Sequence, residues 1–221
     1  IESYLAKQFP DYSVRRAFTS QIIMNHILAR DGEKIDNVEQ ALERAKKNGV
    51  KELIVQPTHL MQGKEYDELK ETLDKHKADF AKVALAEPLL GEVGKDAEEV
   101  NADKEQVATL LVQAAVTDGG FDSVQKAGQE GAAFVFLGHG TSHTAAITYS
   151  EMQTAMRKLG YNNVFIGTVE GEPAETAVDA VIEAVKKAGY KKVTLRPMMV
   201  VAGDHAHNDM AGAEEDSWVQ K

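Results

Sequence analysis

Short apolar runs alternate along the second half of the chain with longer stretches whose apolar residues recur at helical spacing. The run Ala133–Leu137 is continuously apolar, which is typical of a strand buried on both faces of a sheet. Two further strands are expected over residues 163–169 and 192–199, and the second intervening helix ends at Gly189. This order of strands and helices predicts a βαβαβ unit with a parallel sheet.

The first half has the same alternation in a less regular form. We expect strands over residues 13–18, 52–57 and 82–86, and helices over residues 21–30, 64–77 and 104–117. Another helix starts at Asp36 or Asn37 and ends at Gly49, whereas residues 91–103 and 121–131 are expected to be a loop and a connector. The whole chain is therefore predicted to be α/β.

An internal repeat links the two halves. Residues 38–63 align without a gap with residues 178–203, and the two segments share a glycine, a proline and a second glycine at matching places. We therefore predict an internal duplication, with two Rossmann-like lobes, residues 1–125 and 126–221, whose parallel sheets face a cleft. By this symmetry the first lobe lacks the counterpart of strand 133–137, so an apolar strand is expected upstream of Ile1.

Charge and composition narrow the class of partner. The chain has 35 acidic and 25 basic residues and a net charge of −10, which disfavours nucleic acid as the main partner. No stretch of the roughly 18 apolar residues that a membrane helix needs is present, so no membrane partner is expected. The absence of cysteine excludes disulfides and thiolate metal ligands. A cytoplasmic location is the expectation, and the oligomeric state stays open, a homo-oligomer included.

Three polar residues follow consecutive strands of the second half: His139, Glu170 and His205. The carboxyl ends of parallel strands lie on one edge of a sheet, where ligands bind, so these side chains are expected to meet. Two imidazoles and a carboxylate suit a divalent first-row metal ion and leave coordination positions open. The same set could act as base and acid without a metal.

A second group of residues is expected to line a pocket. His59 follows the strand at 52–57, and the repeat places it opposite Met199, which is otherwise a plain core residue. Glu87 follows the strand at 82–86. We assign these three residues to substrate binding, together with Thr141 and Ser142 from the loop after His139.

Other sequence motifs near His139 do not support a specific catalytic or cofactor site. Ser142 and His143 resemble a nucleophile and its base, but the surrounding GHGTSH is not a nucleophile elbow. The same loop lacks the further glycine of a dinucleotide site and the lysine of a phosphate loop, so no nucleotide cofactor is expected. His207 is interpreted as accessory, and His26 and His76 as solvated helix residues.

Three segments carry a strong resemblance to a known family. The segments VFLGHGTSH, IGTVEGEP and PMMVVAGDHAHNDMAGAEEDSW resemble the sirohydrochlorin cobaltochelatases of anaerobic cobalamin biosynthesis. The resemblance implies a ferrochelatase-like (class II chelatase) fold and insertion of Co(II), as the substrate metal, into the tetrapyrrole sirohydrochlorin without ATP. The family's metal site matches His139, Glu170 and His205, with His139 and Glu170 also catalytic. Family members extend beyond both ends of the region matched here, so both lobes are expected to be incomplete.

Alternative functions remain at this point. Related members of the family use Fe(II) or Ni(II), so a ferrochelatase or nickel chelatase is one alternative. A protein that binds a tetrapyrrole or a metal without turnover is another. A metal-dependent hydrolase with the same three residues is a third, although no nucleophile motif supports it.

Overall fold

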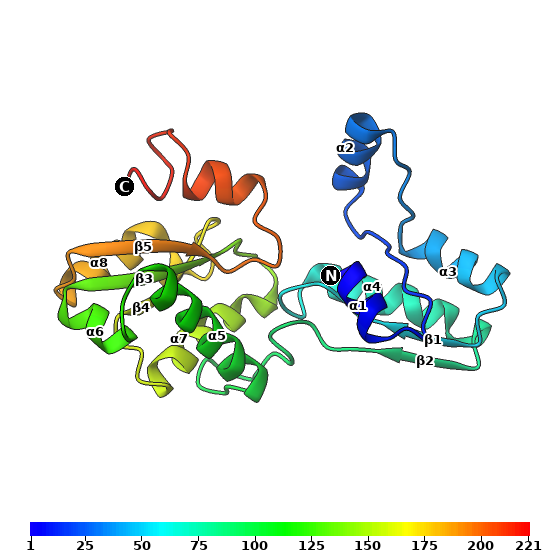
Figure 1. Cartoon of the computed structure of the whole chain (residues 1–221), viewed down its shortest axis with the longest axis horizontal. Coiled ribbons are helices and arrows are strands. Elements are labelled where there is room, and N and C mark those ends of the chain that lie inside the picture. The colour runs from blue at the N-terminus through cyan, green and yellow to red at the C-terminus, as the bar shows by residue number, and fades with distance from the viewer. The chain divides into compact units, whose positions relative to one another are not determined.

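All strands of the computed structural model, which describes residues 1–221, are parallel and lie in two sheets (Figure 1). One sheet pairs β1 (Glu52–Val55) with β2 (Lys82–Leu85). The other has the order β4-β3-β5 and consists of β3 (Ala132–Gly138), β4 (Val164–Thr168) and β5 (Lys192–Pro197). The prediction of an α/β fold with parallel sheets is confirmed.

The central strand β3 is buried along its whole length because its two faces meet different helices. Phe134 and Phe136 pack on one face in a core formed with α5 (Ala102–Asp118), α6 (Val124–Gln129) and α7 (Ile147–Lys158). The alternate residues Val135 and Leu137 face the other way, toward α8 (Val178–Lys187) and Trp218. The continuous apolar run thus covers both faces of the strand.

The two-stranded sheet has a smaller core. Leu42, Leu73 and Phe80 form its buried cluster, together with partly buried residues of β1 and β2. Ile54, which points from β1 in the opposite direction, is 57% exposed, so only one face of this sheet is covered. The helices of this part are α1 (Glu2–Gln8), α2 (Gln21–Asp31), α3 (Val38–Lys47) and α4 (Lys64–His76).

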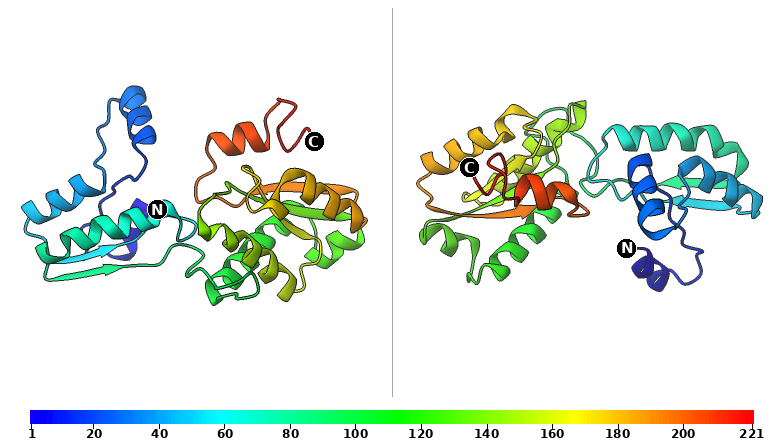
Figure 2. Two further views of the ribbon diagram at one scale, coloured as in Figure 1. Left: turned by 180° about the vertical axis from the view of Figure 1, so that it is seen from behind. Right: turned by 90° about the horizontal axis from the view of Figure 1, so that it is seen from above.

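Short helical turns complete the chain. They are η1 (Lys77–Asp79), η2 (Thr144–Ala146), η3 (Ala174–Thr176) and η4 (Ala206–Met210). Figure 2 shows η4 and the C-terminal residues, coloured orange to red, in the same part of the chain as the three-stranded sheet. No helix combines the length and apolar character needed to span a membrane.

The chain divides into two compact units at places that differ from the predicted boundary. The first unit holds residues 1–56 and 65–86, and the second holds residues 57–64 and 87–221. The sequence-based boundary after residue 125 assigns α5 to the first lobe. In the structure α5 belongs to the second unit, because Ala108 and Val112 of this helix share a core with Met152 and Met156 of α7.

Two predicted elements also differ from those observed. No strand forms over residues 13–18, where Phe18 makes only an isolated bridge to Asn37. The expected connector 121–131 contains α6, whose N-terminus is capped by the Ser123 side chain. Only Val124 and Ala127 of this six-residue helix are buried, and so short a segment shows no apolar periodicity in the sequence.

The repeated segments have the same local structure. Helix α3 spans residues 38–47 and α8 spans the equivalent residues 178–187. Each is followed by a glycine in the left-handed conformation, Gly49 with φ 73° and Gly189 with φ 84°. Glycine adopts this conformation without steric cost and ends the helix, and β1 and β5 then begin at equivalent positions.

Candidate metal centre

The hydrogen bonds of the three-stranded sheet continue beyond the strands and bring two of the candidate residues together. Gly138, the last residue of β3, pairs with Thr168, the last residue of β4. Past this point the Val169 amide donates to the Gly138 carbonyl (3.0 Å), and the Glu170 amide donates to the His139 carbonyl (2.8 Å). The backbone therefore places Glu170 beside His139 at the carboxyl edge of the sheet.

His205 arrives at the same edge from the segment after β5. Its Nε2 atom lies 3.0 Å from Nε2 of His139, and the two rings meet edge to face with centroids 4.3 Å apart. Oε1 of Glu170 lies 3.8 Å from Nε2 of His139. The three side chains expected to meet from the strand order are thus neighbours, and each is about half exposed, at 48%, 54% and 48% for His139, Glu170 and His205.

The partners of the far ring nitrogens determine which nitrogen carries hydrogen. Nδ1 of His139 lies 2.9 Å from the Gly140 carbonyl oxygen, and Nδ1 of His205 lies 2.6 Å from Oδ2 of Asp209. A carbonyl or a carboxylate only accepts, so each Nδ1 must donate. In the neutral rings both Nε2 atoms then present lone pairs to each other. Such an arrangement is repulsive until a cation, either a metal ion or a proton, lies between them.

The separation of the two nitrogens suits one metal ion. Two imidazole nitrogens about 2.0–2.2 Å from the same ion are separated by roughly 2.8–3.6 Å at angles between a right angle and tetrahedral. The observed 3.0 Å falls within this range. Glu170 stands slightly outside it, and no group of three His, Asp or Glu side chains in residues 1–221 already has a metal-binding arrangement. The two imidazoles thus have a spacing that suits one metal ion, whereas Glu170 would bind the same ion only after moving closer to them.

The glycines on either side of His139 hold this loop close to its neighbours. A Cβ at Gly138 would overlap the Tyr149 ring, and a Cβ at Gly140 would lie 2.7 Å from Cβ of Glu170. The Gly140 amide donates to the Tyr149 hydroxyl at 3.1 Å. Burial raises the pKa of Tyr149, and backbone hydrogen bonds from Gly140 and His139 oppose that rise. Tyr149 is therefore a neutral support beneath the loop.

Comparison with known proteins identifies the family of the chain. Residues 1–221 match the family described as cobalt chelatase (CbiK). The chain belongs to the cobalt chelatase family. It is 32% identical over 220 residues to a sirohydrochlorin cobaltochelatase of Salmonella typhimurium, covering 98% of this chain and 74% of that protein. It is 31% identical over 212 residues to the sirohydrochlorin cobaltochelatase CbiKC of Nitratidesulfovibrio vulgaris, covering 96% and 68%. The resemblance seen in the sequence motifs is confirmed.

In this family member the loop after His139 makes local hydrogen bonds. Oγ1 of Thr141 accepts from the His143 amide (3.1 Å), and Nδ1 of His143 accepts from the Ala145 amide (3.2 Å) at the start of η2. Ser142 is exposed in the same loop. Met199 follows β5 and is half-buried next to the fully buried Met198. His143 therefore caps a helical turn, and it is not part of the histidine pair.

The two candidates from the first half of the sequence lie in the second unit, with the histidine pair. The backbone of His59 accepts from the Leu89 amide (3.1 Å), and that of Leu60 accepts from the Leu90 amide (2.9 Å), so the segments after β1 and β2 run together. Leu90 is fully buried in the core beneath β3. Glu87 accepts a hydrogen bond from the Gln62 side chain at 2.5 Å. Both segments are thus anchored to the core that supports His139.

A buried ion pair secures the chain just after Glu87. Nζ of Lys104 in α5 lies 3.0 Å from Oε2 of Glu151 in α7, and both side chains are fully buried. Lys104 also donates to the Leu90 carbonyl (3.0 Å), and Oε1 of Glu151 accepts from the Gly94 amide (2.7 Å). The pair therefore tethers residues 90–94 to two helices. Both residues look like ordinary surface charges in the sequence, and no local pattern indicates their burial.

Proposed function

We propose that this chain is a sirohydrochlorin cobaltochelatase, which inserts Co(II) into sirohydrochlorin for anaerobic cobalamin synthesis without a nucleotide cofactor. Membership of the cobalt chelatase family supports the reaction class. The names of the two relatives support the tetrapyrrole. The observation that carries the proposal for this chain is the 3.0 Å separation of Nε2 of His139 and Nε2 of His205, because two imidazole nitrogens at this distance can bind one metal ion.

The proposed reaction requires ligand exchange at the metal and removal of protons from the tetrapyrrole. Co(II) must exchange water for ligands that later release it, and two pyrrole N–H protons must leave as the metal enters the ring. Nε2 of His139 and Nε2 of His205 bind the incoming ion in the neutral state, and each can take up one proton once the ion has left. Glu170 offsets part of the metal charge. His139 and Glu170, which are joined through the backbone, act as the catalytic pair.

The substrate is held by the surrounding loops in this proposal. Thr141 and Ser142 follow His139 directly and offer hydroxyl groups to a polycarboxylate, while Met199 offers apolar contact for a flat macrocycle. His59 and Glu87 contribute from the two anchored segments, where Gln62 orients the Glu87 carboxylate. Binding energy from these contacts would be available to bend the ring and expose a nitrogen lone pair.

We extend the proposal to the architecture of the chain. The matching bounds of α3 and α8, with matching glycines and strands behind them, support an internal duplication into two Rossmann-like lobes of the class II chelatase type. The two lobes are proposed to correspond to the two compact units, so that α5 belongs to the second lobe. Their arrangement across a cleft stays a prediction.

The test is turnover with sirohydrochlorin and Co(II), followed by the absorbance of the tetrapyrrole. Wild-type protein is expected to turn over many times, while His139→Ala and His205→Ala each lose activity by roughly a hundredfold or more. His26→Ala is the matched control, because His26 is an exposed imidazole on α2 in the other unit.

Two outcomes would contradict the proposal. If both alanine variants matched the wild type over a range of Co(II) concentrations, the ligand roles would be wrong. If the wild type bound the metal and the tetrapyrrole in stoichiometric amounts without turnover, the chain would be a binding protein instead of an enzyme. Fe(II) and Ni(II), assayed in parallel, identify the preferred metal.

A further inference from the structure

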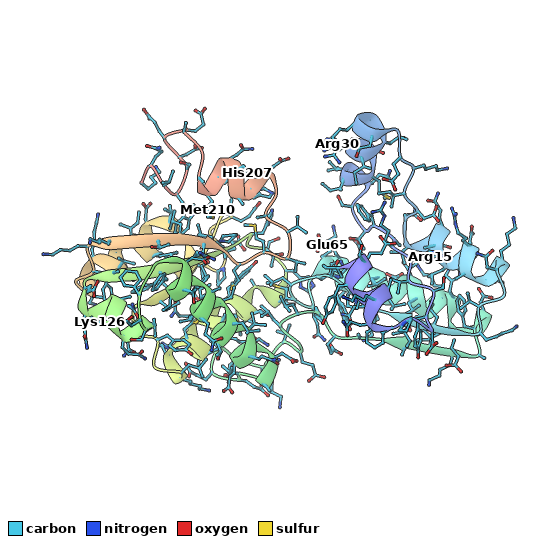
Figure 3. All side chains as sticks on the ribbon, viewed as in Figure 1. Arg15, Arg30, Glu65, Lys126, His207 and Met210 are labelled. Atoms are coloured by element: carbon cyan, nitrogen blue, oxygen red, sulfur yellow. The ribbon has the colours of Figure 1, made fainter.

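The turn that follows His205 carries a carboxylate on the face of that imidazole. His205 directly precedes η4, and Asp209 lies four residues later, one helical turn along the same face. Nδ1 of His205 and Oδ2 of Asp209 are 2.6 Å apart. Figure 3 labels His207 and Met210 on this turn, on either side of Asp209 in the sequence. His207, which lies between the two interacting residues, is exposed and takes no part in this contact.

Asp209 is itself held in place by the end of the chain. Its carbonyl oxygen accepts from the Trp218 amide (2.8 Å), and the Met210 carbonyl accepts from the Val219 amide (3.0 Å). The Trp218 ring is buried against Gly167 of β4, where a Cβ would lie 2.5 Å from the indole. A buried tryptophan thus anchors the turn to the sheet, so the carboxylate has a defined position from which to hold His205.

We propose that Asp209 is a positioning residue for the metal step, which keeps hydrogen on Nδ1 of His205 and so directs the Nε2 lone pair toward His139. This inference rests on the proposed function, because the direction of the Nε2 lone pair matters only if that nitrogen binds the metal. In a free imidazole the hydrogen exchanges between the two nitrogens. A carboxylate that accepts from Nδ1 selects one tautomer, fixes the ring plane and makes the other nitrogen a better metal donor.

The two histidines are supported by groups of different charge. His139 donates to the neutral carbonyl of Gly140, whereas His205 donates to a carboxylate. A hydrogen bond to a charged acceptor is roughly twice as strong as one to a neutral acceptor. His205 is therefore the more firmly oriented partner of the pair, and loss of the Asp209 carboxylate affects its ring more than a change of overall charge would.

The experiment compares Asp209→Ala and Asp209→Asn with Asp204→Asn. Asp204 immediately precedes His205 and is exposed, so its change to asparagine removes the same charge next to the same histidine without touching Nδ1. Long-range proton–nitrogen spectra of the metal-free protein at pH 8 report the tautomer, and His205→Ala assigns the signals. Calorimetric titration with Co(II) alone reports affinity, and circular dichroism checks the fold.

The wild type and Asp204→Asn are expected to hold hydrogen on Nδ1 of His205, and Asp209→Ala to show a mixture of tautomers. Co(II) affinity should fall about 10- to 100-fold in Asp209→Ala, with partial rescue in Asp209→Asn, whose amide oxygen still accepts. An unchanged tautomer or an unchanged affinity in Asp209→Ala would overturn the inference. If the tautomer responds as expected but the wild type binds no Co(II), the proposed function fails while the control of His205 by Asp209 stands.

Discussion

Gly140 shows how a single backbone position sets the geometry of the histidine pair. Its φ of 94° lies in a region that residues with a Cβ rarely adopt, and its missing side chain leaves room for Glu170. The same amide donates to the buried Tyr149 hydroxyl, so the loop is held from below while it carries His139 above. Conformational freedom and space are thus both needed at this one residue.

The change Gly140→Ala is expected to reduce chelation on the order of tenfold to a hundredfold, because the new Cβ displaces Glu170 or the loop that carries His139. Strain at this φ should also cost about 1–3 kcal/mol of stability. Turnover with Co(II) and thermal unfolding measure the two effects. Gly160→Ala is the control, since Gly160 has a φ of 78° but open space around it. If Gly140→Ala kept the same chelation activity as Gly160→Ala, the new Cβ would not disturb Glu170 or the His139 loop, and this expectation would be wrong.

Among the secondary-structure elements, α3 and α4 are joined by a histidine that the sequence suggests is solvated. Nε2 of His76, at the end of α4, lies 2.9 Å from Oε1 of Glu39 in α3, and Nδ1 lies 3.2 Å from Oδ2 of Asp79 in η1. Lys46 of α3 also pairs with Asp79 at 2.6 Å. The side chain of His76 is only 15% exposed, so the interpretation of it as a solvated residue is wrong.

This cluster predicts a dependence of stability on pH. The hydrogen bond to Glu39 is the main cause that raises the pKa of His76, and Asp79 adds to it. The protonated ring therefore stabilises the fold fully below the unfolded pKa of about 6.5, and this contribution is lost as pH rises through the folded value. His76→Gln should lower the urea midpoint more at pH 5.5 than at pH 8.5. His26→Gln serves as the exposed control, and an equal loss at both values would rule out the charged pair.

At the scale of the whole molecule, the two compact units differ in how much apolar surface they bury. The second unit has a core on both faces of β3, whereas the first has a single cluster beneath a two-stranded sheet. A sheet with one face covered offers fewer buried contacts per backbone hydrogen bond. Stability is therefore expected to be unevenly distributed along the chain, with the histidine pair on the more stable unit.

Hydrogen exchange measures this difference directly. Amides of β3 are expected to exchange at least about tenfold more slowly than those of β1 and β2. The reason is that β3 can open only when the apolar clusters on both of its faces unfold. Leu73→Ala, in the smaller core, should speed exchange in β1 and β2 and leave β3 unchanged. Equal protection in both sheets, or a response of β3 to this variant, would show that the chain unfolds as one cooperative body.

Much of this arrangement follows from local sequence patterns. The apolar run at β3, the helical spacing of α7 and the paired segments at α3 and α8 predict the elements because periodicity reflects burial. The meeting of His139, Glu170 and His205 follows from a topological rule, since parallel strands end on one edge. The contact of His205 with Asp209, four residues later, depends on the helical turn η4, which the sequence patterns did not predict.

Only the tertiary structure determined the contacts between segments far apart in the chain. The assignment of α5 to the second unit depends on how its small residues fit against α7. The burial of Lys104 with Glu151 depends on two helices and a loop meeting at one point, so neither residue's neighbours in the sequence reveal it. Tyr149 beneath the His139 loop and Trp218 beneath η4 are further examples. Periodicity records whether a side chain is buried, but the partner that it meets is decided by packing in three dimensions.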